Sequence, residues 1–302
     1  MNKNIHFGEL IILLLIFFSA CTTNEKKAVE QQSYNIVVLE GPTRVGFESM
    51  LDQSVKLPVA TYSEIYDNPL QIQTLMLQNK PDVAVIPTTM AANLYNKGVD
   101  YVPLGCAIWG NLYLVSSDST IKTSTDLRNK EIYLFNKGLQ PDLLAKIRFN
   151  PYNVKFNYKY DSHLELASAI AGGVVSTAVL PEPFVSRAMQ ANPDIRIIDE
   201  VNFMHNGRRI PQTLIMIKRS LIPCKKVIED YIYQVIDASI NNNSLPAMTV
   251  KRCNIRFSPI DSCKEDIQFY LGSMYGYNPK LIGNKFPDND FYNWTTKPVN
   301  PQ

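Results

Sequence analysis

From residue 34 onward, short apolar runs alternate with segments in which apolar residues recur at helical spacing. The apolar runs are YNIVVL (34–39), LPVATY (57–62), DVAVI (82–86), YVPLGCAI (101–108) and LYLVSS (112–117). Runs of this length between helical segments predict β-strands that alternate with α-helices. Because most of the runs are apolar throughout, we expect a parallel sheet that helices cover on both faces.

Local signals mark where the intervening helices begin and end. Asp67 and Pro69 precede a segment that carries three leucines, and proline is favoured at the first position of a helix. Gly98 follows the segment TTMAANLYNK and is expected to end that helix. Further along, Ser162 stands three residues before Glu165, which is the spacing of a capping box.

The pattern then starts again, which indicates an internal repeat. The run STAVL leads into Pro181, which lies 94 residues after Pro87 at the end of DVAVI, and Ile132 lies 96 residues after Ile36. The second set continues with a helix (PDLLAKIRF, 141–149), a strand (VKFNYKY, 154–160), a helix (SHLELASAIAGG, 162–173) and the runs IRIID (195–199) and TLIMI (213–217). Since the two offsets agree closely, the sequence predicts two similar α/β units.

After residue 217 the apolar spacing becomes helical, over residues 219–241 and 261–275. We expect these helices to cover the first unit. The chain would leave that unit near residues 114–120 and return near residues 211–215, and two adjacent crossings make a hinge. The predicted lobes are residues 34–115 with 213–302, and residues 116–212.

Residues 10–18, LIILLLIFF, form an apolar run behind Lys3. This run is too short to span a membrane, which needs about 20 residues, but it suits the core of an export signal. The next residues, FSAC, resemble a bacterial lipobox. We therefore expect residues 1–20 to be a lipoprotein signal peptide and Cys21 to carry the acyl chains, palmitate among them, that anchor the protein. The polar residues 21–33 are expected to form a tether. An ordinary cleaved signal with an incidental cysteine is the alternative.

Composition excludes some partners. The 302 residues carry a formal net charge of +2 without a basic cluster, so we expect no nucleic acid as a partner. Four further cysteines lack the paired spacing of a zinc site, and we expect no metal: Cys106, Cys224, Cys253 and Cys263. Export permits disulfides, with Cys253–Cys263 as the local candidate and unpaired buried thiols as the alternative.

The fold class predicts where a ligand would bind. In open parallel sheets, ligands lie beyond the carboxyl ends of the strands, beside the following helix starts. Four segments hold such positions: 41–44 (GPTR), 87–89 (PTT), 136–140 (NKGLQ) and 181–183 (PEP). If the two units face each other, all four segments converge on one cleft. The N–H groups at helix starts favour polar or anionic ligand groups there.

Five small or hydroxyl-bearing residues in these segments are candidate ligand contacts: Gly41, Thr43, Thr88, Thr89 and Gly138. The glycines let a ligand approach the backbone closely, and the threonines offer hydroxyl groups. Each residue also has a purely structural explanation, because glycines serve turns and threonines cap helices.

Three larger side chains are candidates with opposite implications. Arg44 is suited to a carboxylate, sulfonate or phosphate, or else is simply solvated. Trp109 is suited to stacking on a planar ligand, or else is buried at the junction of the units. Glu182 is suited to a ligand amine or ring N–H, or else only complements a helix dipole. These residues therefore leave open whether the ligand is an anion or a planar cationic or amino-bearing ring.

The ordered motifs GPT, DVAVIPTTMAANLYNKG, WGNLYLV, STDLRNKEIYLFNKG, PD and LPEPF resemble ABC-transporter substrate-binding proteins of the nitrate/sulfonate and thiamine-precursor group. The similarity covers about residues 34–218. It implies the type II periplasmic-binding fold, in which two α/β lobes are joined by two hinge crossings. The contacts that it implies are Thr43, Thr88, Trp109, Gly138 and Glu182. Arg44 departs from the group, where we expect a small or apolar residue.

The resemblance implies a monomeric solute-binding protein of an ABC importer, without a cofactor and without enzymatic activity. It would capture a small polar or aromatic solute, such as nitrate, a sulfonate or a pyrimidine, and deliver it to a permease driven by ATPase subunits. The lipid on Cys21 would hold it at the cell envelope, facing the periplasm or the outside.

Two other functions are compatible with the sequence. One is an enzyme on the same fold, as in the menaquinone pathway. Against it, His6 lies in the signal, and His163 and His205 have no catalytic partners at a recognisable spacing. The other is a sensor subunit that passes the closed state to a signalling partner.

Overall fold

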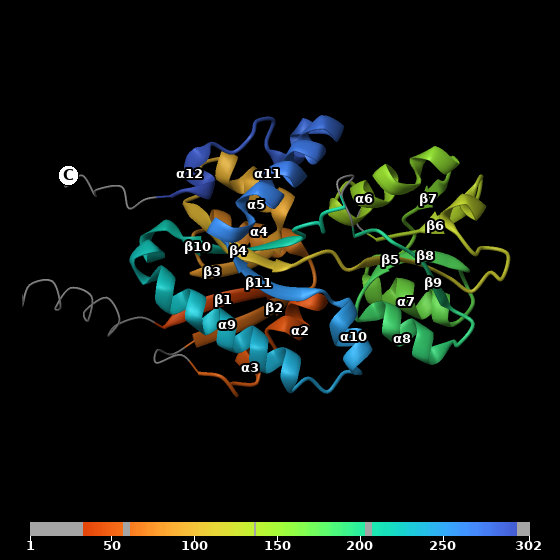
Figure 1. Ribbon diagram of the computed structural model, residues 1–302, viewed down its shortest axis with the longest axis horizontal. Helices are drawn as coiled ribbons and strands as arrows, with labels where there is room; N and C mark the ends of the chain where they lie inside the picture. The colour runs from red at the N-terminus through yellow and green to blue at the C-terminus, as the bar shows by residue number, and fades with distance from the viewer. Residues whose placement is uncertain (1–32, 57–60, 136, 203–206, 295–302) are drawn as a thin grey trace, which may run out of the picture.

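Two β-sheets lie side by side along the long axis of the molecule, each with helices on both faces (Figure 1). The computed structural model describes residues 33–56, 61–135, 137–202 and 207–294. The expected signal peptide (1–20), Cys21 and all but the last residue of the expected tether (21–33) lie outside these ranges. Within the described ranges, no helix is both long and apolar enough to cross a membrane.

The first sheet has six strands: β1 (Tyr34–Leu39), β2 (Thr61–Tyr66), β3 (Val83–Pro87), β4 (Tyr101–Ile108), β10 (Thr213–Lys218) and β11 (Ile255–Pro259). Their order across the sheet is β11-β4-β10-β3-β1-β2. Strand β1 runs parallel to β2 and β3, whereas β10 is antiparallel to β3 and β4. Of the strand predicted over residues 57–62, Thr61 and Tyr62 lie in β2, and residues 57–60 lie outside the described ranges. The described residues of β2 alternate in burial because β2 is an edge strand.

The second sheet has five strands: β5 (Leu112–Ser116), β6 (Glu131–Tyr133), β7 (Lys155–Asn157), β8 (Thr177–Pro181) and β9 (Arg196–Glu200). Their order is β7-β6-β8-β5-β9. Strands β7, β6 and β8 run parallel, and β5 is antiparallel to both β8 and β9.

Five strands of the first sheet have the same arrangement as the five strands of the second, which confirms the internal repeat; β11 has no counterpart. Each set of five has three parallel strands, then one antiparallel strand, then a fifth strand. Pro87 and Pro181 end the equivalent strands β3 and β8. The expected parallel sheet holds for three strands of each sheet, whereas β10 and β5 are antiparallel because each enters its sheet directly from the other one. They arrive at the edge where the parallel strands end, and therefore run in the opposite direction.

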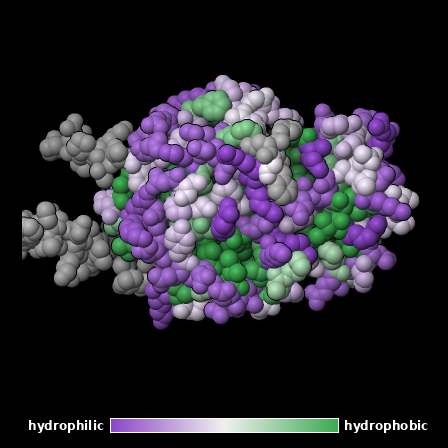
Figure 2. Space-filling model, in the orientation of Figure 1, coloured by the Kyte–Doolittle hydropathy of each residue, from purple (hydrophilic) through white to green (hydrophobic). Residues whose placement is uncertain are grey.

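Helices bury both faces of each sheet. The helices are α2 (Pro42–Gly46), α3 (Glu48–Leu51), α4 (Pro69–Leu77), α5 (Thr88–Asn96), α6 (Gln140–Phe149), α7 (His163–Ala171), α8 (Phe184–Ala191), α9 (Lys225–Asn241), α10 (Ala247–Arg252), α11 (Ile260–Tyr277) and α12 (Asn289–Tyr292). On the first sheet, α3 and α9 cover one face and α4, α5 and α11 the other; on the second, α7 and α8 lie opposite α6. Alternate residues of β3 show the need for both layers, since Val83 and Val85 face α9 and Ala84 and Ile86 face α5. The visible surface is mostly hydrophilic (Figure 2).

The predicted helix boundaries hold with one shift. Asn68 caps α4, with its Oδ1 accepting from the backbone N of Leu70 at 2.9 Å, so the cap lies one residue after Asp67. Ser162 caps α7 by accepting from the backbone N of Glu165 at 3.0 Å, as predicted. Gly98 follows α5 at φ +82°, a conformation that glycine adopts without strain.

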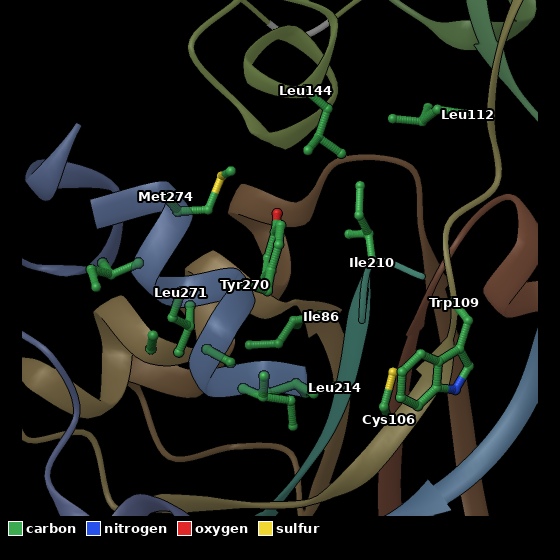
Figure 3. Close-up of a cluster of buried hydrophobic side chains, with 14 of the residues drawn as sticks. Ile86, Cys106, Trp109, Leu112, Leu144, Ile210, Leu214, Tyr270, Leu271 and Met274 are labelled. Carbon is green, nitrogen blue, oxygen red and sulfur yellow. The ribbon is translucent and has the colours of Figure 1, made fainter. Parts of the chain in front are cut away.

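One cluster of buried apolar side chains includes residues of both sheets and of the helices that pack on them (Figure 3). Ile86 belongs to the first sheet, Leu112 to the second, and Leu144 to α6. Tyr270 of α11 lies between Ile86 and Leu144 in Figure 3. Apolar burial stabilises by roughly 25 cal/mol per Å². The two halves are therefore held together by packing as well as by the chain.

The chain crosses between the sheets within residues 109–111 and again within 201–212. The first crossing precedes the predicted position at 114–120, because LYLVS pairs with β8 and β9 in the second sheet. The C-terminal helices α9 and α11 pack on the first sheet, as predicted. Strand β11 was not predicted, since its sequence IRFSP carries charged and polar residues.

The thiols of Cys106, Cys224, Cys253 and Cys263 are all buried and free. The local disulfide candidate is therefore not formed, and the unpaired alternative holds. Burial raises the pKa of the Cys263 thiol to about 12, so it stays protonated and unreactive near neutral pH.

Candidate ligand-binding site

A cavity of about 310 Å³ lies between the two sheets. Pro87 at the end of β3 and Pro181 at the end of β8 both line it, so the two equivalent strand ends meet there. All four segments predicted to converge contribute lining residues. The volume falls within the range of small-molecule sites, about 300–1,000 Å³.

The walls of the cavity are mainly apolar. The apolar lining residues come from both halves: Leu39, Pro42, Pro69, Leu70, Met90, Leu112, Phe135, Leu139, Pro141 and Leu281. Water gains little by contacting such walls, so a ligand that covers them with apolar surface is favoured.

Two buried polar side chains line the cavity without partners among the described residues, and the buried Nδ1 atom of the lining residue His163 is unpaired as well. Gln140, the first residue of α6, and Thr213, the first residue of β10, are each only 4% exposed. Among the residues that the structure describes, the side-chain oxygen and nitrogen of Gln140 have no hydrogen-bond partner, and neither does the hydroxyl group of Thr213. A buried polar group left unpaired costs about 1–3 kcal/mol. Both side chains are therefore available to a bound molecule.

His163, the first residue of α7, adds a neutral ring to the lining. Its ring packs edge-on against Phe135, with ring centroids 4.8 Å apart, and its Nδ1 atom is buried. Burial lowers the pKa of His163 to about 4. The imidazole is thus uncharged near neutral pH and supplies polarity without charge.

Acid is expected to destabilise the protein through His163. In the unfolded chain this imidazole gains a proton as the pH falls through about 6.5, whereas in the folded protein it stays neutral down to about 4. The unfolded state binds more protons in this window, so the free energy of unfolding falls between pH 6.5 and pH 4, by at most about 3 kcal/mol. Urea unfolding at pH 7, 5.5 and 4.5 measures this loss, and His163→Gln should make it smaller. Equal losses in both proteins would contradict the assignment.

The protein's own carboxylates lie at two of the helix starts near the cavity. Asp142, fully buried at the start of α6, accepts from the backbone N of Gly138 at 2.7 Å and from Lys146 Nζ at 2.8 Å. Glu182, fully buried before α8, accepts from the backbone N of Ser186 at 3.0 Å. The positive ends of these two helices are therefore already balanced from within.

Three of the predicted contact residues line the cavity: Thr43, Thr89 and Gly138. Thr43 Oγ1 donates to the carbonyl of Leu39 at 2.6 Å, which leaves its lone pairs as acceptors. Gly41 lies next to the lining residue Pro42, and its φ of 100° favours glycine at this turn.

Two predicted residues beside these do not line the cavity. Thr88 is fully buried and donates its hydroxyl to the carbonyl of Pro211, while its backbone N donates to Gln212 O at 3.1 Å. Arg44 is 47% exposed and lies near Glu40 and Glu48 at 3.4 and 3.6 Å. Thr88 thus secures a chain crossing, and Arg44 forms surface ion pairs.

The other two predicted residues also lie outside the lining and contact C-terminal residues. Trp109 Nε1 donates to the carbonyl of Arg256 at 2.9 Å, and the Arg256 guanidinium lies 4.6 Å from the indole centre. Glu182 Oε1 accepts from Arg252 Nε at 2.5 Å, and Ser186 Oγ donates to the same oxygen at 2.9 Å. The alternatives fit these contacts: Trp109 is buried at the junction, and Glu182 accepts from Ser186 in the first turn of α8.

Sequence reasoning did not single out Gln140, Thr213 or His163. Gln140 stands within the predicted segment 136–140, but nothing local distinguishes it from a surface glutamine at a helix start. Thr213 falls where a chain crossing was expected. Their common feature, burial without a partner, exists only in the folded chain.

No protein-family model and no curated protein matches this chain, but solved structures do. A protein from Parabacteroides distasonis described as an ABC transporter has a TM-score of 0.77 and 25% sequence identity, covering 87% of this chain and 99% of its own. The periplasmic aliphatic sulphonate binding protein SsuA from Escherichia coli has a TM-score of 0.64 and 14% identity, covering 85% and 96%. The alkanesulfonate-binding protein SsuA from Xanthomonas axonopodis pv. citri, bound to MOPS, has a TM-score of 0.60 and 15% identity, covering 84% and 95%. The chain therefore has the periplasmic binding protein fold, and the predicted fold class is confirmed.

Proposed function

We propose that this chain, which has the periplasmic binding protein fold, is the solute-binding protein of an ABC importer. The observation that carries the proposal is the cavity between the sheets, where the equivalent strand ends at Pro87 and Pro181 meet. A repeat that contributes the same strand end twice to one cavity is suited to holding a ligand between two lobes. The proposal assigns no catalytic step to the chain.

The mechanism follows from the two crossings. The first sheet with α2–α5 and α9–α12 forms one proposed lobe, and the second sheet with α6–α8 forms the other. A solute that touches both lobes favours their closed arrangement by as much as its affinity for that state exceeds its affinity for the open one. A membrane permease with ATPase subunits would then accept the closed, loaded form.

The proposed contacts are five lining residues that can hydrogen-bond a solute: Thr43, Thr89 and Thr213 from the first lobe, and Gly138 and Gln140 from the second. Anchoring outside the cytoplasmic membrane through a lipid on Cys21 is part of the proposal and is supported by the sequence FSAC behind an apolar run. The protein acts as a monomer, because one chain supplies both sides of the cavity.

Native mass spectrometry combined with X-ray scattering tests this function. We expect the purified protein to carry one small molecule per chain. Its removal should increase the radius of gyration, because the lobes separate, and its return should reverse the change. A folded protein that neither retains nor takes up any small molecule from a cell extract would overturn the proposal.

A further inference from the structure

We infer that the solute is an uncharged, largely apolar molecule with one amide-like group, which Gln140 and Thr213 bind. This inference rests on the proposed function and goes beyond it by naming the class of solute. Three observations carry it: the unpaired polar atoms, the use of the helix starts within the protein, and the charges at the rim.

The unpaired atoms define what the solute must offer. Gln140 presents one carbonyl oxygen and one NH₂ group, both buried and both without partners among the described residues. Thr213 adds a hydroxyl from the opposite lobe under the same conditions. A carboxamide, lactam, urea or imide carries an acceptor next to a donor and can satisfy Gln140 through both. A carboxylate or sulfonate has only acceptors and would leave the Gln140 oxygen unpaired.

Four positions at the helix starts offer no free N–H group to an anion. Pro42 and Pro141, in the first turns of α2 and α6, have no N–H group to donate. The Gly138 N–H is bound to the buried carboxylate of Asp142, and the Thr88 N–H to the carbonyl of Gln212. Anion binding at a helix start depends on donors that are free to point at the ligand. At these four positions the donors are committed inside the protein or absent.

Charged side chains of the lining lie at its rim and balance in sign. They are Glu40, Asp67, Lys97 and Lys280. The lysines and Asp67 are exposed to solvent, and Glu40 lies 3.4 Å from Arg44. Exposed charges are screened by water and contribute little to binding. Among the described lining residues, no fully buried side chain carries a charge, so a charged solute would be desolvated without compensation.

Size and wall chemistry complete the description. A volume of 310 Å³ is about that of ten water molecules in the liquid. The neutral His163 and Phe135 form part of the wall, beside the aliphatic residues. The site therefore suits a compact apolar or aromatic body that presents its polar group to Gln140.

Identification of the captured solute tests the inference. Ligand-free protein is incubated with a small-molecule extract of bacterial cells and repurified. The retained compound is then released by denaturation and identified by mass spectrometry in both ion modes. We expect a compound without a formal charge that contains an amide, lactam, urea or imide. A retained carboxylate, sulfonate, phosphate or amine cation would overturn the inference and leave the proposed function standing. Failure of the folded protein to retain any compound would defeat both.

Two variants then test the residues, with the retained compound as the probe. Gln140→Leu removes both amide partners and Thr213→Val removes the hydroxyl, and we expect each to weaken binding at least about 10-fold in calorimetry. Gln234→Leu, on the exposed side of α9, is the matched control and should bind like the unchanged protein. Unchanged affinity in Gln140→Leu would overturn its role even if the solute is neutral.

Discussion

Replacing Arg252 by methionine is expected to lower the free energy of unfolding by about 3–5 kcal/mol. Arg252 Nε lies 2.5 Å from Oε1 of Glu182, whose side chain is fully buried. Arg252 Nη2 also donates to Ser186 Oγ at 2.7 Å. Without the guanidinium, the carboxylate keeps its buried position but loses its balancing charge. Urea unfolding at pH 7 measures the loss.

A double-mutant cycle separates this effect from lost packing. Adding Glu182→Gln to Arg252→Met removes the buried charge itself and should restore much of the stability. Arg148→Met is the matched control, because Arg148 is 54% exposed in its ion pair with Asp199 and should cost no more than about 1 kcal/mol. If Arg252→Met and Arg148→Met lower the free energy of unfolding equally, the buried ion pair contributes no more to stability than the exposed one.

Leu139→Trp is expected to weaken solute binding by about 100-fold while the protein stays folded. Leu139 lines the cavity just before α6 with ordinary extended backbone angles, φ −95° and ψ 177°, so an indole is compatible with the chain path. The larger ring fills space that the solute needs, and overpacking of this kind costs up to about 3 kcal/mol. Calorimetry with the solute that copurifies with the unchanged protein measures the loss.

Leu77→Trp is the control for this change. Leu77, at the end of α4, is 57% exposed and does not line the cavity. It should therefore bind the solute like the unchanged protein. If both tryptophan variants bind equally well, the cavity between the sheets is not where the solute lies.

Patterns that depend on neighbours in sequence could be predicted. The apolar runs that form β3 and β8 are buried on both faces, so their composition alone indicates covered strands, and their 94-residue offset indicates the repeat. The caps at Ser162 and Asn68 act within one helical turn, which is why their helices begin at or within one residue of the prediction. The direction of β10 could not be predicted, because it depends on which sheet the chain has just left.

The sequence predicted where the candidate site lies, but it identified only some of the residues that line it. Its position follows from strand ends, which the apolar runs locate. Glu182 has the local setting of a ligand contact, yet its partner Arg252 comes 70 residues later in the chain. Trp109 is similar, since Arg256 lies 147 residues beyond it. Gln140 is the opposite case. Nothing in the sequence distinguishes it, and only folding buries its side chain without a partner.

The strands of the first sheet come from two separate stretches of the chain, and this affects the order in which the two halves can fold. The second sheet comes from one continuous stretch, residues 112–200, whereas the first must wait for β10, which inserts between β3 and β4 after residue 212. While a nascent chain is still growing, a gap thus separates β4 from β3, and closing it requires contacts between segments more than 100 residues apart. Domains usually mature in the order of their synthesis. Here the half that begins first is the half that can finish only last.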